Sequence, residues 1–200
     1  MKVLPIGIQR FKDLRENDNL YVNKNRITCD LPNSGKYYFL SRPRRFGKSL
    51  LLSTIKELFL RSRELFNDLW IADHWDWGQK HNIIHISFSS IGYKTMRLEA
   101  AVHNALDQIA KEYKIELTAT AYDQKFKELI QALATDTKTV ILIDEYDKPI
   151  IDYLTDLPQA QKHQEILKNF YSVIKDSDQC IRFLRITESL NLAKSASFQN

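Results

Sequence analysis

Four short runs of β-forming apolar residues recur along the chain, at residues 37–40, 83–88, 139–143 and 180–186. Between these runs, apolar residues recur every three or four positions, as on one face of an amphipathic helix, at residues 51–59, 98–109, 126–133 and 166–174. Phe11 and Leu14 indicate one more short helix near the start. Strands that alternate with helices in this way are typical of a mostly parallel sheet. The pattern therefore predicts an α/β fold with helices on both faces of the sheet.

Composition narrows the protein class further. Of 200 residues, 44% are hydrophobic and the formal net charge is +4, which excludes a disordered or fibrous chain and fits one compact unit. Cys29 and Cys180 cannot form a disulfide framework, and two reduced thiols are typical of a cytoplasmic protein. Residues 1–7 do not resemble a signal peptide, and no apolar run approaches the roughly 18 residues of a membrane span. We therefore expect a cytoplasmic protein with no membrane partner.

A polar segment, Ser41-Arg42-Pro43-Arg44-Arg45-Phe46-Gly47-Lys48-Ser49, joins the first apolar run to the helical segment that follows it. A phosphate-binding loop between a strand and a helix needs a glycine where the backbone approaches the ligand, a lysine for the phosphates and a hydroxyl for Mg²⁺. Gly47, Lys48 and Ser49 meet these needs. The general pattern has a further glycine at position 42, where this chain has Arg42. The segment therefore predicts a phosphate loop that departs from the general pattern at that position.

A pair of carboxylates ends the third apolar run, where Asp144 and Glu145 follow residues 140–143. Open α/β sheets bind their ligands at the carboxyl ends of the strands. Asp144 can hold Mg²⁺ there, and Glu145 can orient or deprotonate the water that attacks a γ-phosphate. Taken alone, the pair also fits a solvated loop after a core strand. Because a phosphate loop and an acidic strand end each imply the other in phosphoryl transfer, we interpret them together as one site.

The residues around both segments resemble a known family. Beside the phosphate loop, the matching stretches are Tyr38-Phe39-Leu40, Leu50-Leu51-Leu52-Ser53-Thr54, Pro5-Ile6-Gly7-Ile8-Gln9-Arg10-Phe11, Tyr21-Val22-Asn23-Lys24 and Ile143-Asp144-Glu145-Tyr146-Asp147-Lys148-Pro149-Ile150. Together they resemble the AAA-ATPase-like family of P-loop proteins, which often carry a C-terminal PD-(D/E)xK nuclease-like domain. The Arg-Pro-Arg-Arg-Phe-Gly-Lys-Ser loop is usual in that family, so Arg42 departs from the general pattern but not from the relatives.

The resemblance implies one P-loop domain over residues 1–200, with an N-terminal segment, 1–35, and a nucleotide-binding core, 36–200. It implies the additional-strand, catalytic-glutamate arrangement, in which another strand separates the acidic strand from the strand before the phosphate loop. Relatives continue into a helical lid, so the chain is expected to stop before the last strand and the lid.

The resemblance also assigns site residues. ATP would be bound by Arg44, Arg45, Phe46, Gly47, Lys48, Ser49 and Leu50. Ser49 and Asp144 would hold Mg²⁺, and catalysis would involve Glu145, Lys48 and Thr187, with Thr187 as the polar sensor of the γ-phosphate. Relatives tend to have glycine after this threonine, where this chain has Glu188.

These features predict an ATP- and Mg²⁺-binding domain whose ATP hydrolysis drives or gates a partner, such as a second copy or a nuclease-like domain. One alternative is a nucleotide-dependent switch without useful turnover, which Arg42 and Glu188 favour. A second is a nucleic-acid-binding module that uses the basic loop. A nuclease site within the chain is not supported, because the short D/E-x-K pattern occurs at 112–114, 123–125 and 136–138 without a convincing upstream carboxylate.

Overall fold

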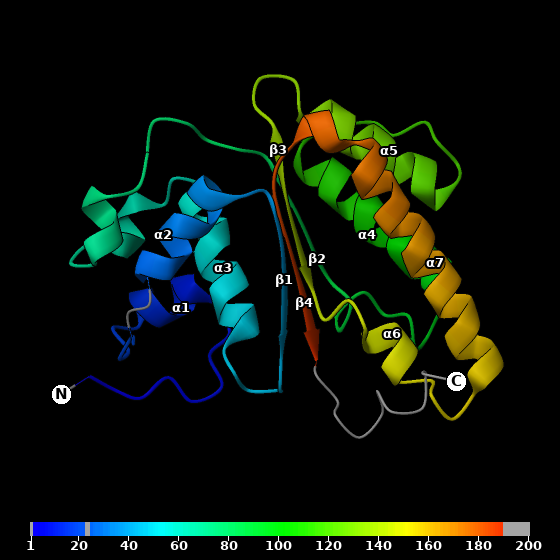
Figure 1. Ribbon diagram of the computed structural model, residues 1–200, viewed down its shortest axis with the longest axis horizontal. Coiled ribbons are helices and arrows are strands. Elements are labelled where there is room, and N and C mark those ends of the chain that lie inside the picture. The colour runs from blue at the N-terminus through cyan, green and yellow to red at the C-terminus, as the bar shows by residue number, and fades with distance from the viewer. Residues whose placement is uncertain (1, 23–24, 190–200) are drawn as a thin grey trace.

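A four-stranded, all-parallel sheet forms the centre of the computed structural model, which describes residues 2–22 and 25–189. The order across the sheet is β1 (Tyr37–Arg42), β4 (Ile181–Ser189), β3 (Thr139–Asp144) and β2 (Ile83–Ser87). All four carboxyl ends lie at the lower edge in Figure 1. The α/β fold predicted from the sequence is confirmed, and β4 lies between β1 and β3 as the resemblance implied.

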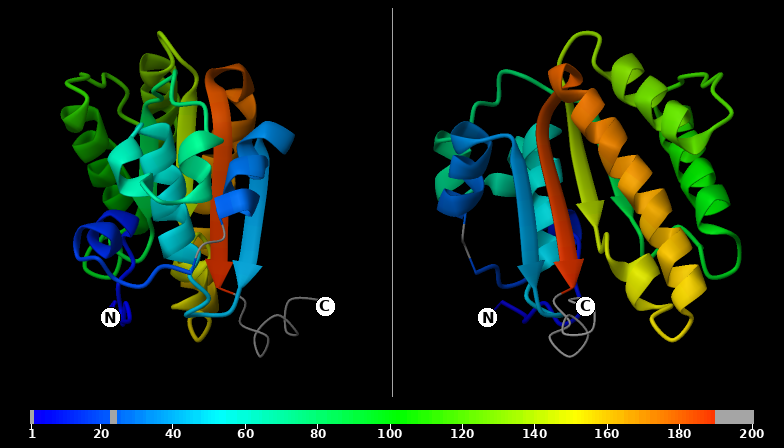
Figure 2. Two further views of the ribbon diagram at one scale, coloured as in Figure 1. Left: turned by 90° about the vertical axis from the view of Figure 1, so that its left-hand side faces the viewer. Right: turned by 45° about the vertical axis from the view of Figure 1, so that its right-hand side comes forward.

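The larger part of the core lies on one face of the sheet. Figure 2 shows the layer of helices that covers this face. This layer comprises α4 (Leu98–Glu112), α5 (Tyr122–Leu133) and α7 (Leu157–Asp176), with the short α6 (Lys148–Ile151) after β3 and the 3-10 turn η3 (Asp178–Cys180) before β4. Phe126 of α5 and Phe170 of α7 stack with their ring centroids 3.9 Å apart. The apolar faces predicted from the helical spacing are therefore the faces that this core buries.

The opposite face is covered by α3 (Lys48–Phe59), whose Leu52, Ile55 and Phe59 pack on strand residues. Outside α3 lie α1 (Phe11–Glu16), α2 (Asn25–Ser34), and the 3-10 turns η1 (Arg63–Phe66) and η2 (Trp70–Asp73). The amide of Phe11 donates to Ser53 Oγ of α3 at 2.8 Å. The N-terminal segment is thereby fixed to the helix that follows the phosphate loop.

Helix α2 was not predicted. Pro32, Asn33 and Gly35 indicate a turn, yet the helix continues to Ser34. Its inner side buries Thr28 and Cys29. Packing on η2 therefore outweighs the weak helix propensity of this polar sequence.

The helices of the described ranges, 2–22 and 25–189, include none with the length and hydropathy required to cross a bilayer.

Arg185 on β4 is an unusual core residue, and it yields a stability prediction. It is 5% exposed, its Nε and Nη1 have no hydrogen-bond partner among the described residues, and burial lowers the pKa of its guanidinium. A buried polar group without a partner costs about 1–3 kcal/mol. We expect Arg185→Met to raise the free energy of unfolding in urea by about that amount. Arg182→Met, which removes a hydrogen bond to the Pro32 carbonyl of 3.0 Å, should lower it, and a loss of stability in Arg185→Met would contradict the prediction.

Candidate functional site

The predicted phosphate loop lies between the end of β1 at Arg42 and the start of α3 at Lys48, at the lower edge of the sheet in Figure 1. Gly47 is the N-cap of α3 and has a φ of +70°, a left-handed conformation that favours glycine. A Cβ on Gly47 would meet no heavy atom within 4 Å, so this side of the loop is open. The N–H groups of the first turn of a helix have no partner within the helix. The loop therefore offers backbone donors at an accessible helix N-terminus.

Lys48 is folded into this loop. Its side chain is 7% exposed, and its Nζ donates to the carbonyls of Arg42 at 2.7 Å and Pro43 at 2.9 Å. No carboxylate of residues 2–22 or 25–189 forms an ion pair with it. A buried ammonium usually has an anionic partner, because carbonyl groups compensate only part of its lost hydration. The loop is therefore chemically suited to an anion.

The two predicted carboxylates and Thr187 are brought together at the ends of β3 and β4. Asp144 is 6% exposed and Thr187 is fully buried. The Thr187 hydroxyl donates to Asp144 Oδ1 and accepts the Glu145 N–H at 3.1 Å. Glu145 has a φ of +52°, so the chain turns sharply directly after the strand. Thr187 thus holds both Asp144, the candidate Mg²⁺ ligand, and the backbone of Glu145, the candidate general base.

The sheet register places the loop and the carboxylates at the same edge. Leu40, two residues before the end of β1, pairs with Thr187, and Asp144 pairs with Ser87 on its other side. Asp144 and Thr187 therefore lie at one level of the sheet, close to the start of the phosphate loop. The role of Thr187 as a γ-phosphate sensor stays a prediction, since both partners of its hydroxyl here are protein groups.

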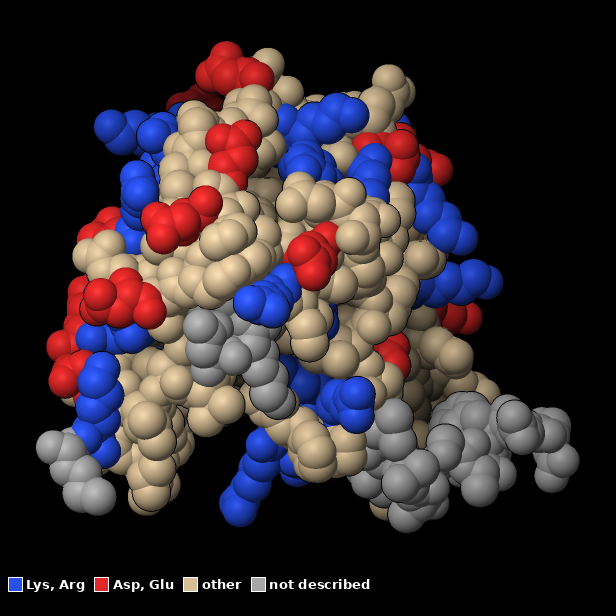
Figure 3. Space-filling view, turned by 60° about the vertical axis from the view of Figure 1, so that its left-hand side comes forward, with Lys and Arg blue, Asp and Glu red and all other residues tan. Residues whose placement is uncertain are grey.

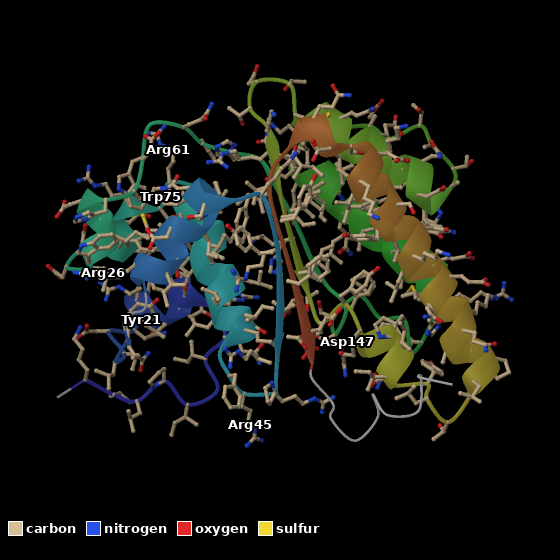
Figure 4. The ribbon with its side chains drawn as sticks, viewed as in Figure 1. Tyr21, Arg26, Arg45, Arg61, Trp75 and Asp147 are labelled. Carbon is tan, nitrogen blue, oxygen red and sulfur yellow. The ribbon has the colours of Figure 1, made fainter. Side chains whose placement is uncertain are left out.

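Glu188 brings a further carboxylate to this edge. Alternate residues of a strand point to opposite faces, so Glu188 points away from Thr187, toward the face covered by α6 and α7. Burial raises the pKa of Glu188, and the nearby charge of Asp147 adds to this increase. Asp147 lies just before α6, beside the lower end of the sheet in Figure 4. Glu188 and Asp147 are therefore neighbours of the candidate site on the other side of the strand layer.

An ion-pair cluster beside Glu145 was missed from the sequence. Asp152 accepts hydrogen bonds from Tyr93 and Lys94, each at 2.7 Å, and lies 3.4 Å from Lys148. Burial opposes its ionisation, but these donors and the Lys148 charge outweigh that effect and lower the pKa of Asp152 to about 2. The cluster fastens the loop after β2 to the segment after Glu145. Only the i,i+4 spacing of Lys148 and Asp152 signals any part of it in the sequence.

Magnesium fits the donor set at this edge. Among the described residues, no three or more His, Cys, Asp and Glu side chains form a group that could hold a metal by themselves. Magnesium in phosphoryl-transfer sites is bound by one or two carboxylates together with substrate phosphates, and it keeps several waters. Asp144 supplies a carboxylate and Ser49 a hydroxyl at the start of α3. These residues suit a cation that arrives with a nucleotide.

Comparisons with known proteins agree with this geometry. The family model described as predicted AAA-ATPase matches residues 5–198. A protein of Azotobacter chroococcum mcd 1, named Uncharacterized protein in vnfD 5'region, is 41% identical over 201 residues. That match covers 98% of this chain but only 39% of the relative. No solved structure matches the chain. Since the family model and the relative each cover nearly the whole chain, the chain belongs to the predicted AAA-ATPase family.

Proposed function

We propose that this domain binds ATP with Mg²⁺ and hydrolyses it. The observation that carries the proposal is the buried Lys48 ammonium, which has carbonyl but no carboxylate partners among the described residues and lies at the same sheet edge as Asp144 and Glu145. A triphosphate would supply the missing anion. The family description, predicted AAA-ATPase, supports the same activity.

Each residue of the site has its own part in this proposal. The backbone of residues 44–50 binds the phosphates, and Lys48 exchanges the carbonyls of Arg42 and Pro43 for phosphate oxygens. Ser49 and Asp144 would hold Mg²⁺, which would neutralise charge that develops on the phosphates. Glu145 orients the attacking water and accepts its proton. Thr187 keeps Asp144 and Glu145 in place and contacts the γ-phosphate when the nucleotide is bound.

This chain spans 39% of the length of the relative that it matches. We propose that the domain, built from the N-terminal segment 1–35 and the core 36–200, drives or gates a second copy or a nuclease-like domain in the cytoplasm. Turnover by the domain alone should then be slow, because a partner's arginine raises such rates by roughly 10³- to 10⁵-fold.

The experiment measures ATP binding by calorimetry and ADP release by a coupled assay on the same preparation, with Mg²⁺ and with excess EDTA. We expect binding and slow ADP release with Mg²⁺, with release abolished in EDTA because the phosphate charge is no longer neutralised. Failure of the folded protein to bind ATP in either condition would refute the proposal.

A nucleotide-dependent switch is the second candidate function, and the same experiment distinguishes it from an ATPase. Glu188 favours it, because a half-buried carboxylate with a raised pKa follows the sensor position where relatives tend to have glycine. The switch predicts ATP binding with no ADP release, even at high protein concentration and in the presence of Mg²⁺. Sustained ADP release would exclude it.

A further inference from the structure

The phosphate loop presents a second, outward side, which we call the arginine turn and define as residues 42–46. Arg42, Arg44, Arg45 and Phe46 are all exposed, while Lys48 is directed inward. Arg45 has a φ of +67°, and Figure 4 shows its side chain projecting from the lower edge, away from the sheet. The loop thus directs one cation, Lys48, into the protein and presents three arginines on its surface. The proposed ATPase site uses the inward cation and the backbone of residues 44–50, so the exposed side chains of Arg44, Arg45 and Phe46 are available to a second ligand.

The outward guanidinium groups have no acidic partner among the described residues. None of Arg42, Arg44 and Arg45 forms an ion pair within residues 2–22 and 25–189. In the space-filling view of Figure 3, basic side chains project at the lower edge of the molecule. Three neighbouring cations without counter-charges repel each other, so an anionic ligand that lies across them is favoured. A ligand with repeated phosphates provides negative charge along its length.

An exposed aromatic side chain accompanies these cations. Phe46 is 66% exposed within the arginine turn. Unpaired bases stack on exposed aromatic rings, whereas the bases of a duplex are already stacked on each other. A turn that presents an exposed aromatic ring among its arginines is therefore more suitable for single strands than for duplexes.

We propose that the arginine turn binds single-stranded nucleic acid, with Arg44 and Arg45 on phosphates and Phe46 under a base. This binding site is additional to the proposed ATP site and does not require ATP hydrolysis. Because the two ligands use opposite sides of one loop, bound Mg-ATP should not displace the nucleic acid.

The test is fluorescence anisotropy of a labelled 20-nucleotide oligo-dT with the full chain, over a series of salt concentrations. We expect the slope of log affinity against log salt to become shallower by about 0.7 in Arg45→Gln, because one fewer phosphate of a single strand is neutralised. Phe46→Ala should weaken binding by about 10-fold at constant salt, because a base can no longer stack on this ring. Excess Mg-ATP should leave the affinity of wild type for the oligonucleotide unchanged.

Arg61 provides a matched control. It is an exposed arginine with a φ of +65°, just beyond the other end of α3, far from Arg45 in Figure 4. Arg61→Gln carries the same charge change as Arg45→Gln and should leave affinity and salt slope unchanged. Melting temperatures check that all variants are folded.

Several results would overturn the proposal. The first is no oligonucleotide binding by wild type, and the second is an equal effect of Arg61→Gln and Arg45→Gln. Displacement of the oligonucleotide by excess Mg-ATP would show that the strand merely occupies the ATP site. Equal affinity for duplex DNA or for anionic lipid vesicles would reveal a general polyanion surface. If wild type binds oligo-dT but not ATP, the ATPase proposal fails and this proposal stands. If wild type binds ATP but not oligo-dT, this proposal fails and the ATPase proposal stands.

Discussion

Replacement of Glu145 by glutamine is expected to reduce ATP turnover by about 10²- to 10⁴-fold while ATP binding persists. The glutamine keeps the size of the side chain and the backbone hydrogen bond to Thr187 Oγ1, so the turn after β3 should be preserved. It cannot accept a proton from the attacking water. Single-turnover ADP formation and calorimetric ATP affinity, measured on the same variant, separate the loss of chemistry from the loss of binding.

Glu188→Gln is the matched control for this change. Glu188 lies at the same sheet edge, and its replacement by glutamine removes the same charge. Its side chain, however, points to the opposite face from Thr187. Its turnover should remain within about threefold of wild type, since a group that does not contact the reacting water contributes little to its deprotonation. Equal losses in both variants would mean that overall charge at this edge, rather than a base at Glu145, limits hydrolysis.

The part of the site that could be predicted from the sequence is the part encoded by short local patterns. A buried strand before Asp144 and a strand-loop-helix pattern around Gly47 each determine their own local structure. Parallel strands then place their carboxyl ends at one edge, so the two segments meet without further information. This is why the fold class, the loop and the carboxylate pair were all predicted. The position of β4 between β1 and β3 came from the family resemblance, because no local pattern specifies strand order.

The remaining features depend on contacts between residues distant in sequence. Tyr93 and Asp152 are 59 positions apart, and nothing in either segment indicates that they share a hydrogen bond. Helix α2 forms because its inner side packs on η2, although its turn-forming residues predict otherwise. The unpartnered guanidinium of Arg185 was equally invisible, since an arginine in a strand usually faces solvent. Tertiary packing decides each of these features, and a single sequence does not display it.

Replacement of Lys48 by alanine is expected to lower ATP affinity by about 10- to 100-fold, because charge-assisted hydrogen bonds to phosphate contribute about 1.5–3 kcal/mol. The change also removes the hydrogen bonds to the carbonyls of Arg42 and Pro43. Those carbonyls are close to solvent at the loop, so water can replace the lysine and the domain should still fold. Equilibrium dialysis with labelled ATP measures the affinity, and urea unfolding checks the fold.

Lys56→Ala is the control, because Lys56 lies on the same helix, two turns further from the loop. It removes the same charge from α3, so a general electrostatic effect on ATP would appear in both variants. We expect only Lys48→Ala to lose affinity. If Lys48→Ala binds ATP as tightly as wild type, the inward ammonium does not contact phosphate. Its burial among carbonyl groups would then serve only to hold the loop closed, and the ATP proposal would lose the observation on which it depends.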